Sequence, residues 1–278
     1  MPFLIKAASH GQTWELKTSL SGPTLLDFLY SKEIPIRSSC MGKGICHQCR
    51  VRVVKGVAPI SSADRKTFSS NALEEGWRLS CQLRPKSNLE IEFPQVYQVG
   101  EHLQKFREPI SDWWLAVDLG TTGIEIAAID HGGEWCRLRS LNAQVIMGAD
   151  VMTRLEYAQR LGVEALHHRL LRQLKKLVSI IVTEAGNCRY LLRAEVAGNS
   201  AMVSFLHCWP IEPLAVSPFQ PVQLAGATSS LGELGEWKSL PLLNSFVGGD
   251  LSAGLFWLWQ RDEMKKSTWI LMDVGTNS

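Results

Sequence analysis

The sequence predicts an α+β protein of two domains, in which a small sheet packs on one helix and an α/β domain follows. Three observations predict this fold class. Four cysteines with defined spacing lie in the first 94 residues, a polar stretch containing Pro109 covers residues 95–112, and a strand–turn–strand pattern opens the remainder. The 278 residues suffice for two domains of about 100–200 residues each. We therefore expect domains at 1–94 and 113–278, joined by a linker at 95–112.

The composition is that of a globular protein. Hydrophobic residues make up 45% of the chain and charged residues 20%, which excludes the disordered and membrane classes. The N-terminal apolar run is too short for a signal peptide, and the most apolar helix candidate, residues 251–259, is too short to span a bilayer. We expect a cytoplasmic protein without a membrane partner. No basic stripe alternates with aromatic residues, so nucleic acid is not an expected partner either.

The cysteine spacing predicts an iron–sulfur cluster. Cys40, Cys46 and Cys49 lie in one short loop, and Cys81 follows far along the chain. Gly42 and Gly44 accept positive φ, so the loop can wrap and direct its backbone N–H groups at sulfur. This pattern is typical of [2Fe–2S] ferredoxins, although the first interval is one residue longer than in the plant type. It resembles the adrenodoxin-like branch, and we expect all four cysteines to be metal ligands and the function to be electron transfer.

Other interpretations of these cysteines stay open. Structural zinc on four thiolates also uses C-x₂-C pairs but usually brings two of them. Disulfides would require export, which nothing in the chain suggests. His47 lies between two expected ligands, yet no second histidine has the spacing of a Rieske site. Cys136, Cys188 and Cys208 lack metal spacing, and we expect reduced thiols there.

Charge is divided unevenly between the two halves. Residues 1–94 carry 13 Lys and Arg against 8 Asp and Glu, a net +5, while residues 95–278 carry 16 against 19, a net −3. A basic electron-transfer domain favours an acidic partner or an acidic face on its own second domain. The alternative is that these charges only form a solvated surface and indicate no binding partner.

The first domain is predicted to have a β-grasp arrangement, as the ferredoxin resemblance implies. Strands are expected at 3–8, 13–18, 50–54 and 89–93, because these runs are apolar and end at turn residues or at Pro94. A helix is expected from Thr24, a plausible N-cap, to about Lys32. Short helical stretches between Ser61 and Glu75 complete the set.

The second domain begins with a strand, a turn and a second strand. The turn carries Asp118, Gly120, Thr121 and Thr122, and a similar unit near the end of the chain carries Asp273, Gly275, Thr276 and Asn277. Such turns offer backbone N–H groups and hydroxyls to a phosphate, and an acid at the strand end can hold Mg²⁺ through water. Paired in this way, they resemble the phosphate loops of the actin, Hsp70 and sugar-kinase ATPase superfamily. We expect both turns to face one cleft.

Residues between the turns have structural interpretations of their own. A helix over 164–184 should pack through Leu166, Leu170, Leu174 and Leu177, which share one face. Asn199 should cap the helix that begins at Ser200. Asp150 and Arg154 have the spacing of an ordinary i,i+4 pair, and residues 218–221 the composition of a rigid loop.

Four segments of the second domain resemble one particular family within this superfamily. They are residues 142–154, 197–202, 218–221 and 248–254. They are similar to a family in which a ferredoxin domain is fused to such an ATPase domain, the ATP-dependent reductive activators of corrinoid proteins and their relatives. The resemblance covers nearly the whole chain. It implies transfer of an electron to cob(II)alamin of a corrinoid protein, giving cob(I)alamin, with ATP offsetting an unfavourable potential. An electron donor and a redox acceptor are the implied partners, and a homodimer is left open.

The C-terminus departs from the family pattern. The chain stops at Ser278, immediately after the second turn, so we expect a truncated ATPase domain that lacks the lobe for adenosine. ATP with Mg²⁺ is therefore doubtful for this chain, no catalytic residue is predicted, and whether the chain is an enzyme stays open. One alternative is a stand-alone [2Fe–2S] module with a non-catalytic docking domain. A small-molecule kinase ranks last, because no residue stands out as a substrate base.

Overall fold

The computed structural model describes residues 3–9, 12–18, 23–32, 34, 36–40, 42–93, 100–261, 268 and 270–272. The chain forms two compact units. The first consists of Met1–Gln98 with Ile146–Ala149, and the second of Val99–Val145 with Asp150–Ser278. No helix among the described residues combines the length and hydropathy needed to cross a bilayer.

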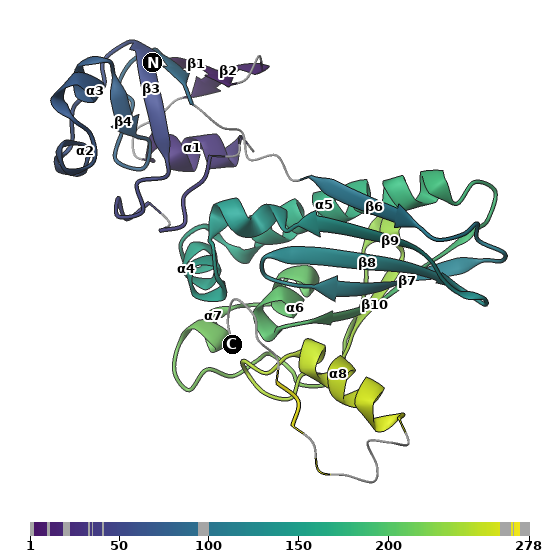
Figure 1. Ribbon diagram of the computed structural model, residues 1–278. Coiled ribbons are helices and arrows are strands. Elements are labelled where there is room, and N and C mark those ends of the chain that lie inside the picture. Colours follow the sequence, from purple (N-terminus) through teal and green to yellow (C-terminus); the bar gives the residue numbers. More distant parts are fainter. Residues whose placement is uncertain are drawn as a thin grey trace. The chain divides into compact units, whose positions relative to one another are not determined.

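The first unit is a five-stranded sheet with one main helix against it (Figure 1). The strand order is β2-β1-β5-β3-β4, and β1 pairs parallel with β5 but antiparallel with β2. The strands are β1 Phe3–Ser9, β2 Gln12–Thr18, β3 Arg50–Lys55, β4 Trp77–Leu79 and β5 Leu89–Glu92. The helices are α1 Leu25–Ser31, α2 Ser62–Thr67 and α3 Ser70–Glu74.

Helix α1 forms where the sequence predicts it. The hydroxyl of Thr24 accepts a hydrogen bond from the N–H of Asp27, and the Asp27 carboxylate reaches back to the N–H of Thr24, which completes a capping box. Leu25 and Leu29 are fully buried, and so is Ile5 on β1. The core of this unit therefore lies where apolar faces of α1 and the sheet are removed from water.

The second unit contains a seven-stranded sheet in the order β11-β12-β10-β7-β8-β9-β6. Strand β10 runs parallel to β7 and β12, and β7, β8 and β9 form an antiparallel meander. The strands are β6 Glu101–Lys105, β7 Trp113–Leu119, β8 Gly123–Asp130, β9 Gly133–Leu141, β10 Tyr190–Gly198, β11 Thr228–Ser230 and β12 Glu236–Ser239. The helices are α4 Val151–Leu161, α5 Val163–Glu184, α6 Ser200–His207, α7 Glu212–Ala215 and α8 Gly249–Trp259, with short 3₁₀ helices at Ala143–Met147 and Gly232–Leu234.

Packing around α5 confirms the predicted helical face. Leu166, Leu170, Leu174 and Leu177 are all fully buried, and α5 contacts β9, α4 and α6. A second anchor lies at the start of β7, where Trp113 stacks on Tyr190 with ring centroids 4.7 Å apart. These contacts fix the directions of β7 and β10, whose C-terminal ends carry the residues described below.

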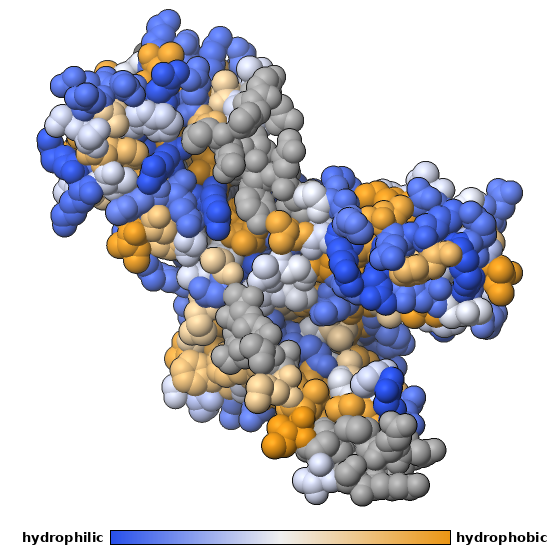
Figure 2. All heavy atoms as spheres, in the orientation of Figure 1, coloured by the Kyte–Doolittle hydropathy of each residue, from blue (hydrophilic) through white to orange (hydrophobic). Residues whose placement is uncertain are grey.

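Apolar side chains are also exposed on the second unit. Figure 2 shows them gathered at the surface over α8. On this helix Phe256 is 66% exposed and Trp259 71%. The outer face of α8 therefore presents large apolar side chains to water.

The interval 95–112 is not only a linker, which corrects the sequence expectation for residues 101–105. This segment, Glu101–Lys105, forms β6 and pairs antiparallel with β9 from Glu101 opposite Ser140 to Lys105 opposite Cys136. Its composition is polar because β6 lies at a sheet edge, where most of its side chains face water.

A buried carboxylate fastens the rest of this interval. Asp130, 2% exposed, accepts hydrogen bonds from Arg107 Nη1 and Nη2 at 2.9 and 2.5 Å and from the backbone N–H of Ile110 at 2.8 Å. The Arg107 hydrogen bonds lower the pKa of Asp130 strongly; burial opposes this shift, and the Ile110 and Gly132 N–H groups reinforce it. Residues 107–110 are thus held to the end of β8.

We predict that Asp130→Asn destabilises the second unit by about 1–3 kcal/mol at neutral pH, because Arg107 loses its ionised acceptor. The folded-state pKa of Asp130 is depressed, so its contribution is complete above the unfolded pKa of about 3.9 and is lost as pH falls toward the folded pKa. Urea unfolding between pH 7 and pH 3 measures both effects. Equal stability losses at the two pH values would contradict the assignment, and Asp112→Asn, at a more exposed ion pair with Arg189, is the control.

Candidate functional site

The cysteine loop of the first unit runs between α1 and β3, and its described residues form neither helix nor strand. Gly42 and Gly44 have φ values of 84° and 75°, the left-handed region that the sequence suggested for them. A Cβ on Gly44 would lie 3.1 Å from Gln82 Nε2 and 3.4 Å from the Cβ of Ala63. Gln82 Nε2 in turn donates to the carbonyl of Gly42 at 3.1 Å. The loop is therefore packed closely against the segment that carries Cys81.

The four sulfur atoms lie in two interacting pairs, Cys40 with Cys46 and Cys49 with Cys81. Burial disfavours the Cys40 thiolate, but hydrogen bonds from Cys46, Ile45 and Gly44 outweigh it and lower the pKa of Cys40 to about 7. The hydrogen bond between Cys49 and Cys81 raises the pKa of Cys49 and lowers that of Cys81. In the described part of the chain, no three His, Cys, Asp or Glu side chains already form a closed metal-ligand group.

The donor set and the backbone around it fit an iron–sulfur cluster. Cys40, Cys49 and Cys81 are buried and Cys46 is partly exposed, so a cluster held by them would be shielded from water on most sides. Backbone N–H groups at Gly44, Ile45 and Cys46 point at thiolate sulfur, which is the hydrogen bonding that sets cluster potentials. The role of these four cysteines as ligands stays a prediction.

In the second unit, the first glycine turn joins β7 to β8, and hydrogen bonds to its carbonyl groups hold it in place. Asn142 Nδ2 donates to the carbonyl of Gly120 at 2.9 Å, and Asn142 N donates to the carbonyl of Thr122 at 2.8 Å. Arg154 Nη2 donates to the carbonyl of Thr121 at 2.6 Å. Because C=O and the next N–H point in opposite directions in a trans peptide, the N–H groups that follow these carbonyls point away from Asn142 and Arg154.

Arg154 holds this turn from a fully buried position on α4, although burial lowers the pKa of Arg154 to about 9. The sequence suggested an ordinary i,i+4 pair with Asp150. The Asp150 charge does partly offset the lowering of the Arg154 pKa, and both residues have further roles. Asp150 is the N-cap of α4, where its carboxylate accepts from the N–H of Thr153 at 2.8 Å. The i,i+4 spacing could not indicate that the guanidinium crosses to another segment.

Asn199 connects the turn to α6. Its side-chain oxygen accepts from the N–H of Met202 at 3.0 Å, which confirms the predicted helix cap. Its Nδ2 donates to Thr121 Oγ1 at 2.9 Å, a contact that the sequence did not reveal. Asn199 follows the last residue of β10, and β10 lies beside β7 with Gly198 opposite Leu119. The two parallel strands thus end at one place.

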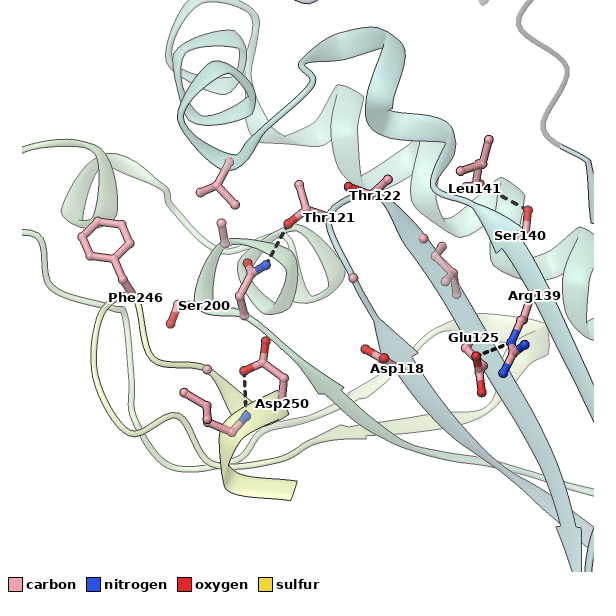
Figure 3. Close-up of a pocket in the computed structure, with 18 of the residues that line it drawn as sticks. Asp118, Thr121, Thr122, Glu125, Arg139, Ser140, Leu141, Ser200, Phe246 and Asp250 are labelled. Carbon is pink, nitrogen blue, oxygen red and sulfur yellow. Dashed lines mark hydrogen bonds and ion pairs between the residues drawn. The ribbon is translucent and has the colours of Figure 1, made fainter. Parts of the chain in front are cut away.

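A cavity of about 920 Å³ lies at these strand ends. Figure 3 shows Asp118, Thr121 and Thr122 on one side of it and Ser200, Phe246 and Asp250 on the other. Three glycines allow the segments around the cavity to approach each other closely. A Cβ on Gly120 would lie 2.7 Å from the carbonyl oxygen of Gly123, and a Cβ on Gly198 would lie 2.9 Å from that of Leu119. A Cβ on Gly248 would lie 2.4 Å from the Cα of Asn199. The cavity therefore combines a polar turn with the N-terminal end of α8.

The second predicted turn cannot be compared with the first. Asp273, Gly275, Thr276 and Asn277 lie outside the described residues. Of the residues just before them, 268 and 270–272 are described and do not form a strand. The meeting of the two turns at one cleft stays a prediction. The structure places Asp118, Gly120, Thr121 and Thr122 together at the cavity.

Comparison with known proteins now assigns the family. A model described as the RACo middle region matches residues 114–261, and a model of the 2Fe-2S iron-sulfur cluster binding domain matches residues 8–86. The chain belongs to the RACo middle-region family. The resemblance to ferredoxin–ATPase fusions seen in the sequence is confirmed, and so is the [2Fe–2S] cofactor of the first domain.

Curated relatives match less than a third of this RACo family member. It is 51% identical over 81 residues to one component of the Na⁺-translocating NADH-quinone reductase of Chlamydia pneumoniae, a match over 29% of this chain and 19% of the relative. For the same component in Actinobacillus succinogenes the identity is 43% over 75 residues, or 27% of this chain and 18% of the relative. The chain thus spans about a fifth of the length of these relatives.

A solved structure resembles nearly the whole RACo family chain. It is a reductive activator for a corrinoid, iron–sulfur protein, with a TM-score of 0.51 and 19% identity over 93% of this chain and 58% of that one. At this identity the likeness concerns the fold, and it confirms the predicted combination of a ferredoxin domain with an actin-like α/β domain.

We predict that replacing any one of Cys40, Cys46, Cys49 or Cys81 by Ser lowers iron and sulfide content sharply, because each supplies one thiolate. Ser at Cys136, Cys188 or Cys208 should leave both unchanged. Metal analysis with EPR of the reduced protein measures this, and the expected content is about two irons and two sulfides per chain with a rhombic signal. One zinc without sulfide would refute the ligand assignment.

We also predict that Arg154→Met destabilises the protein by about 1–3 kcal/mol and speeds amide exchange at residues 120–123, since the Thr121 carbonyl loses its buried donor. Arg160→Met, at an exposed position on the same helix, is the matched control. Hydrogen exchange read by mass spectrometry checks both variants. Unchanged exchange at the turn in Arg154→Met would show that Asn142 and Asn199 hold it without help.

Proposed function

We propose that this chain accepts one electron from a donor, at the site formed by Cys40, Cys46, Cys49 and Cys81, and passes it to a corrinoid protein. The observation that carries the proposal is the pairing of four thiols in a glycine loop whose N–H groups point at sulfur, within a chain of the RACo family. A [2Fe–2S] cluster supplies one-electron chemistry when bound there. The donor loses one electron, and cob(II)alamin of the acceptor gains it to become cob(I)alamin.

The residues of the first unit have distinct tasks in this proposal. Burial of Cys40, Cys49 and Cys81 excludes water from the site. The N–H groups of residues 44–46 stabilise negative charge on sulfur, which favours the reduced state of a bound cluster. Gln82 Nε2 adds a contact to the Cys81 sulfur at 3.4 Å. The loop therefore both holds the site and adjusts its potential.

The cavity of the second unit is proposed to bind the phosphates of a nucleotide. Asn142, Arg154 and Asn199 fix the turn that presents Gly120, Thr121 and Thr122. Asp118, which lines the cavity near the end of β7, would hold Mg²⁺ through water. Asp273, Gly275, Thr276 and Asn277 would contribute a second turn. In this proposal, nucleotide binding biases the protein toward the state that transfers the electron.

A second candidate is a stand-alone [2Fe–2S] module whose second unit serves only for docking. The independent core of the first unit favours it, because a domain with its own core can function alone. Nucleotide binding separates the two candidates.

We predict that this 278-residue chain binds Mg·ATP, but only weakly, because the cavity contacts the phosphates more than the base; no detectable binding would favour the stand-alone module. Among the described residues that line the cavity, Phe246 and His102 are the aromatic side chains available to contact a base. Calorimetry with Mg·ATP tests this, and dithionite titration in parallel tests whether the cluster assembles and accepts an electron. Micromolar affinity would contradict the prediction.

Reduction of a corrinoid protein, followed by the cobalamin absorbance with and without ATP, tests the function itself. ATP-independent formation of cob(I)alamin would favour the stand-alone module. A cluster that is reduced by dithionite but never reduces the corrinoid protein would refute the proposed acceptor.

A further inference from the structure

Charged residues of the first unit are distributed unevenly around the cysteine segments. Residues 34–50 and 76–88, which carry all four cysteines, contain no Asp or Glu. They contain six cations: Arg37, Lys43, Arg50, Arg78, Arg84 and Lys86. The excess of positive charge found in residues 1–94 is therefore concentrated in these two segments.

Five of the six cations are exposed. Arg78 is the exception, because it is 8% exposed and donates to the carbonyls of Ala58, Leu73 and Trp77. Arg37, Lys43, Arg50, Arg84 and Lys86 lie at the surface. They can therefore interact with a molecule that approaches the cysteine loop.

The fold brings the two segments together. Gln82 contacts both Gly42 and Gly44, so Lys43 and Arg84 belong to adjoining parts of one surface. Arg50 Nε donates to the carbonyl of His47 at 2.7 Å, which holds its head group beside the loop. Lys43, Arg50 and Arg84 therefore lie in or next to the loop.

An apolar side chain lies at the tip of the same loop. Ile45, between Gly44 and Cys46, is 71% exposed. An apolar centre with a charged rim is the usual composition of a protein–protein interface. We refer to Arg37, Lys43, Ile45, Arg50, Arg84 and Lys86 as the cluster-end surface.

Three acids of this unit lie on its sheet, where each pairs with a neighbouring cation. The ion pairs are Lys6–Glu15 at 2.9 Å, Arg52–Glu92 at 2.5 Å and Lys55–Glu90 at 3.8 Å. Asp27, Asp64 and Glu74 lie on the helices, and Asp64 is buried. The segments 34–50 and 76–88 thus differ from the sheet in contributing exposed cations and no acid.

We propose that the cluster-end surface is the docking site of a redox protein with an acidic face around its own electron-transfer centre. Complementary charge steers such a partner and shortens the approach to the cysteines, and Ile45 packs on contact. The inference rests on the proposed electron transfer through the cluster, but not on the corrinoid acceptor or on ATP.

The test uses the full chain with its cluster and two reductants of opposite charge. Flavodoxin hydroquinone is the acidic protein probe, and the methyl viologen radical cation is the small cationic probe. As ionic strength rises from about 0.01 to 0.15 M, the Debye length falls from about 30 to about 8 Å. We expect the second-order rate constant for flavodoxin to fall about tenfold over this range, and that for the viologen to rise.

Charge reversal locates the effect. Lys43→Glu and Arg84→Glu should each lower the flavodoxin rate constant severalfold at low salt, with Lys43→Gln and Arg84→Gln in between. Lys17→Glu is the matched control, since it makes the same charge change at an exposed position on the outer strand β2. Rates are referred to the cluster content of each variant, measured by absorbance.

Carbodiimide cross-linking provides a readout that needs no electron transfer. This reagent joins an amine to a carboxylate in direct contact, so mass spectrometry should find Lys43 linked to flavodoxin at low salt and not at high salt. Linkage at Lys17 to the same extent as at Lys43 would overturn the proposal.

The outcomes distinguish this inference from the proposed function. A cluster that neither reductant can reduce would refute electron transfer itself. If the viologen reduces the cluster normally but the flavodoxin rate does not depend on salt, only the docking site is refuted. The same result is expected if negative charge of the second unit neutralises the cluster-end surface, and it would equally refute the docking site. Retention on phosphatidylglycerol vesicles, without a salt effect on flavodoxin, would assign the surface to a membrane instead and overturn the proposal.

Discussion

Hydrogen bonds to the carbonyls of residues 120–122 are the constraint on which the cavity of the second unit depends. Asn142 and Arg154 donate to all three, and they come from segments well separated in the chain. Placing a guanidinium at a fully buried position is costly, and the cost is reduced by the carbonyl of Thr121 and by Gln144 Oε1, 3.3 Å from Nη1. The orientation of the turn, and with it the polarity of one cavity wall, follows from these contacts.

At both sites the direction of the backbone N–H and C=O groups favours negative charge. At the cysteine loop, N–H groups of residues 44–46 point at thiolate sulfur, and at the first turn the carbonyls point away from the cavity. Glycine makes each arrangement accessible for a different reason. Gly44 adopts a positive φ, whereas at Gly120 and Gly248 a side chain would collide with neighbouring backbone.

The sequence predicted the local features and missed contacts between distant segments. The cap at Asn199, the apolar face of α5 and the helix after Thr24 were predictable, because each depends on residues within a few positions of one another. Strand β6 was missed, since its polar composition reflects an edge position that only the pairing with β9 reveals. The reach of Arg154 to Thr121 was also missed, because 33 residues separate them and no periodic pattern links them.

The separation of paired and unbalanced charge in the first unit gives it an electric dipole. Its sheet carries compensated ion pairs, and its cysteine end carries cations in segments that contain no acid. Net charge describes how strongly such a body is attracted, but the dipole determines which end turns toward the attraction before contact is made. Residues 1–94 carry a net +5, so an acidic partner would attract this unit and rotate it so that its cysteine end leads.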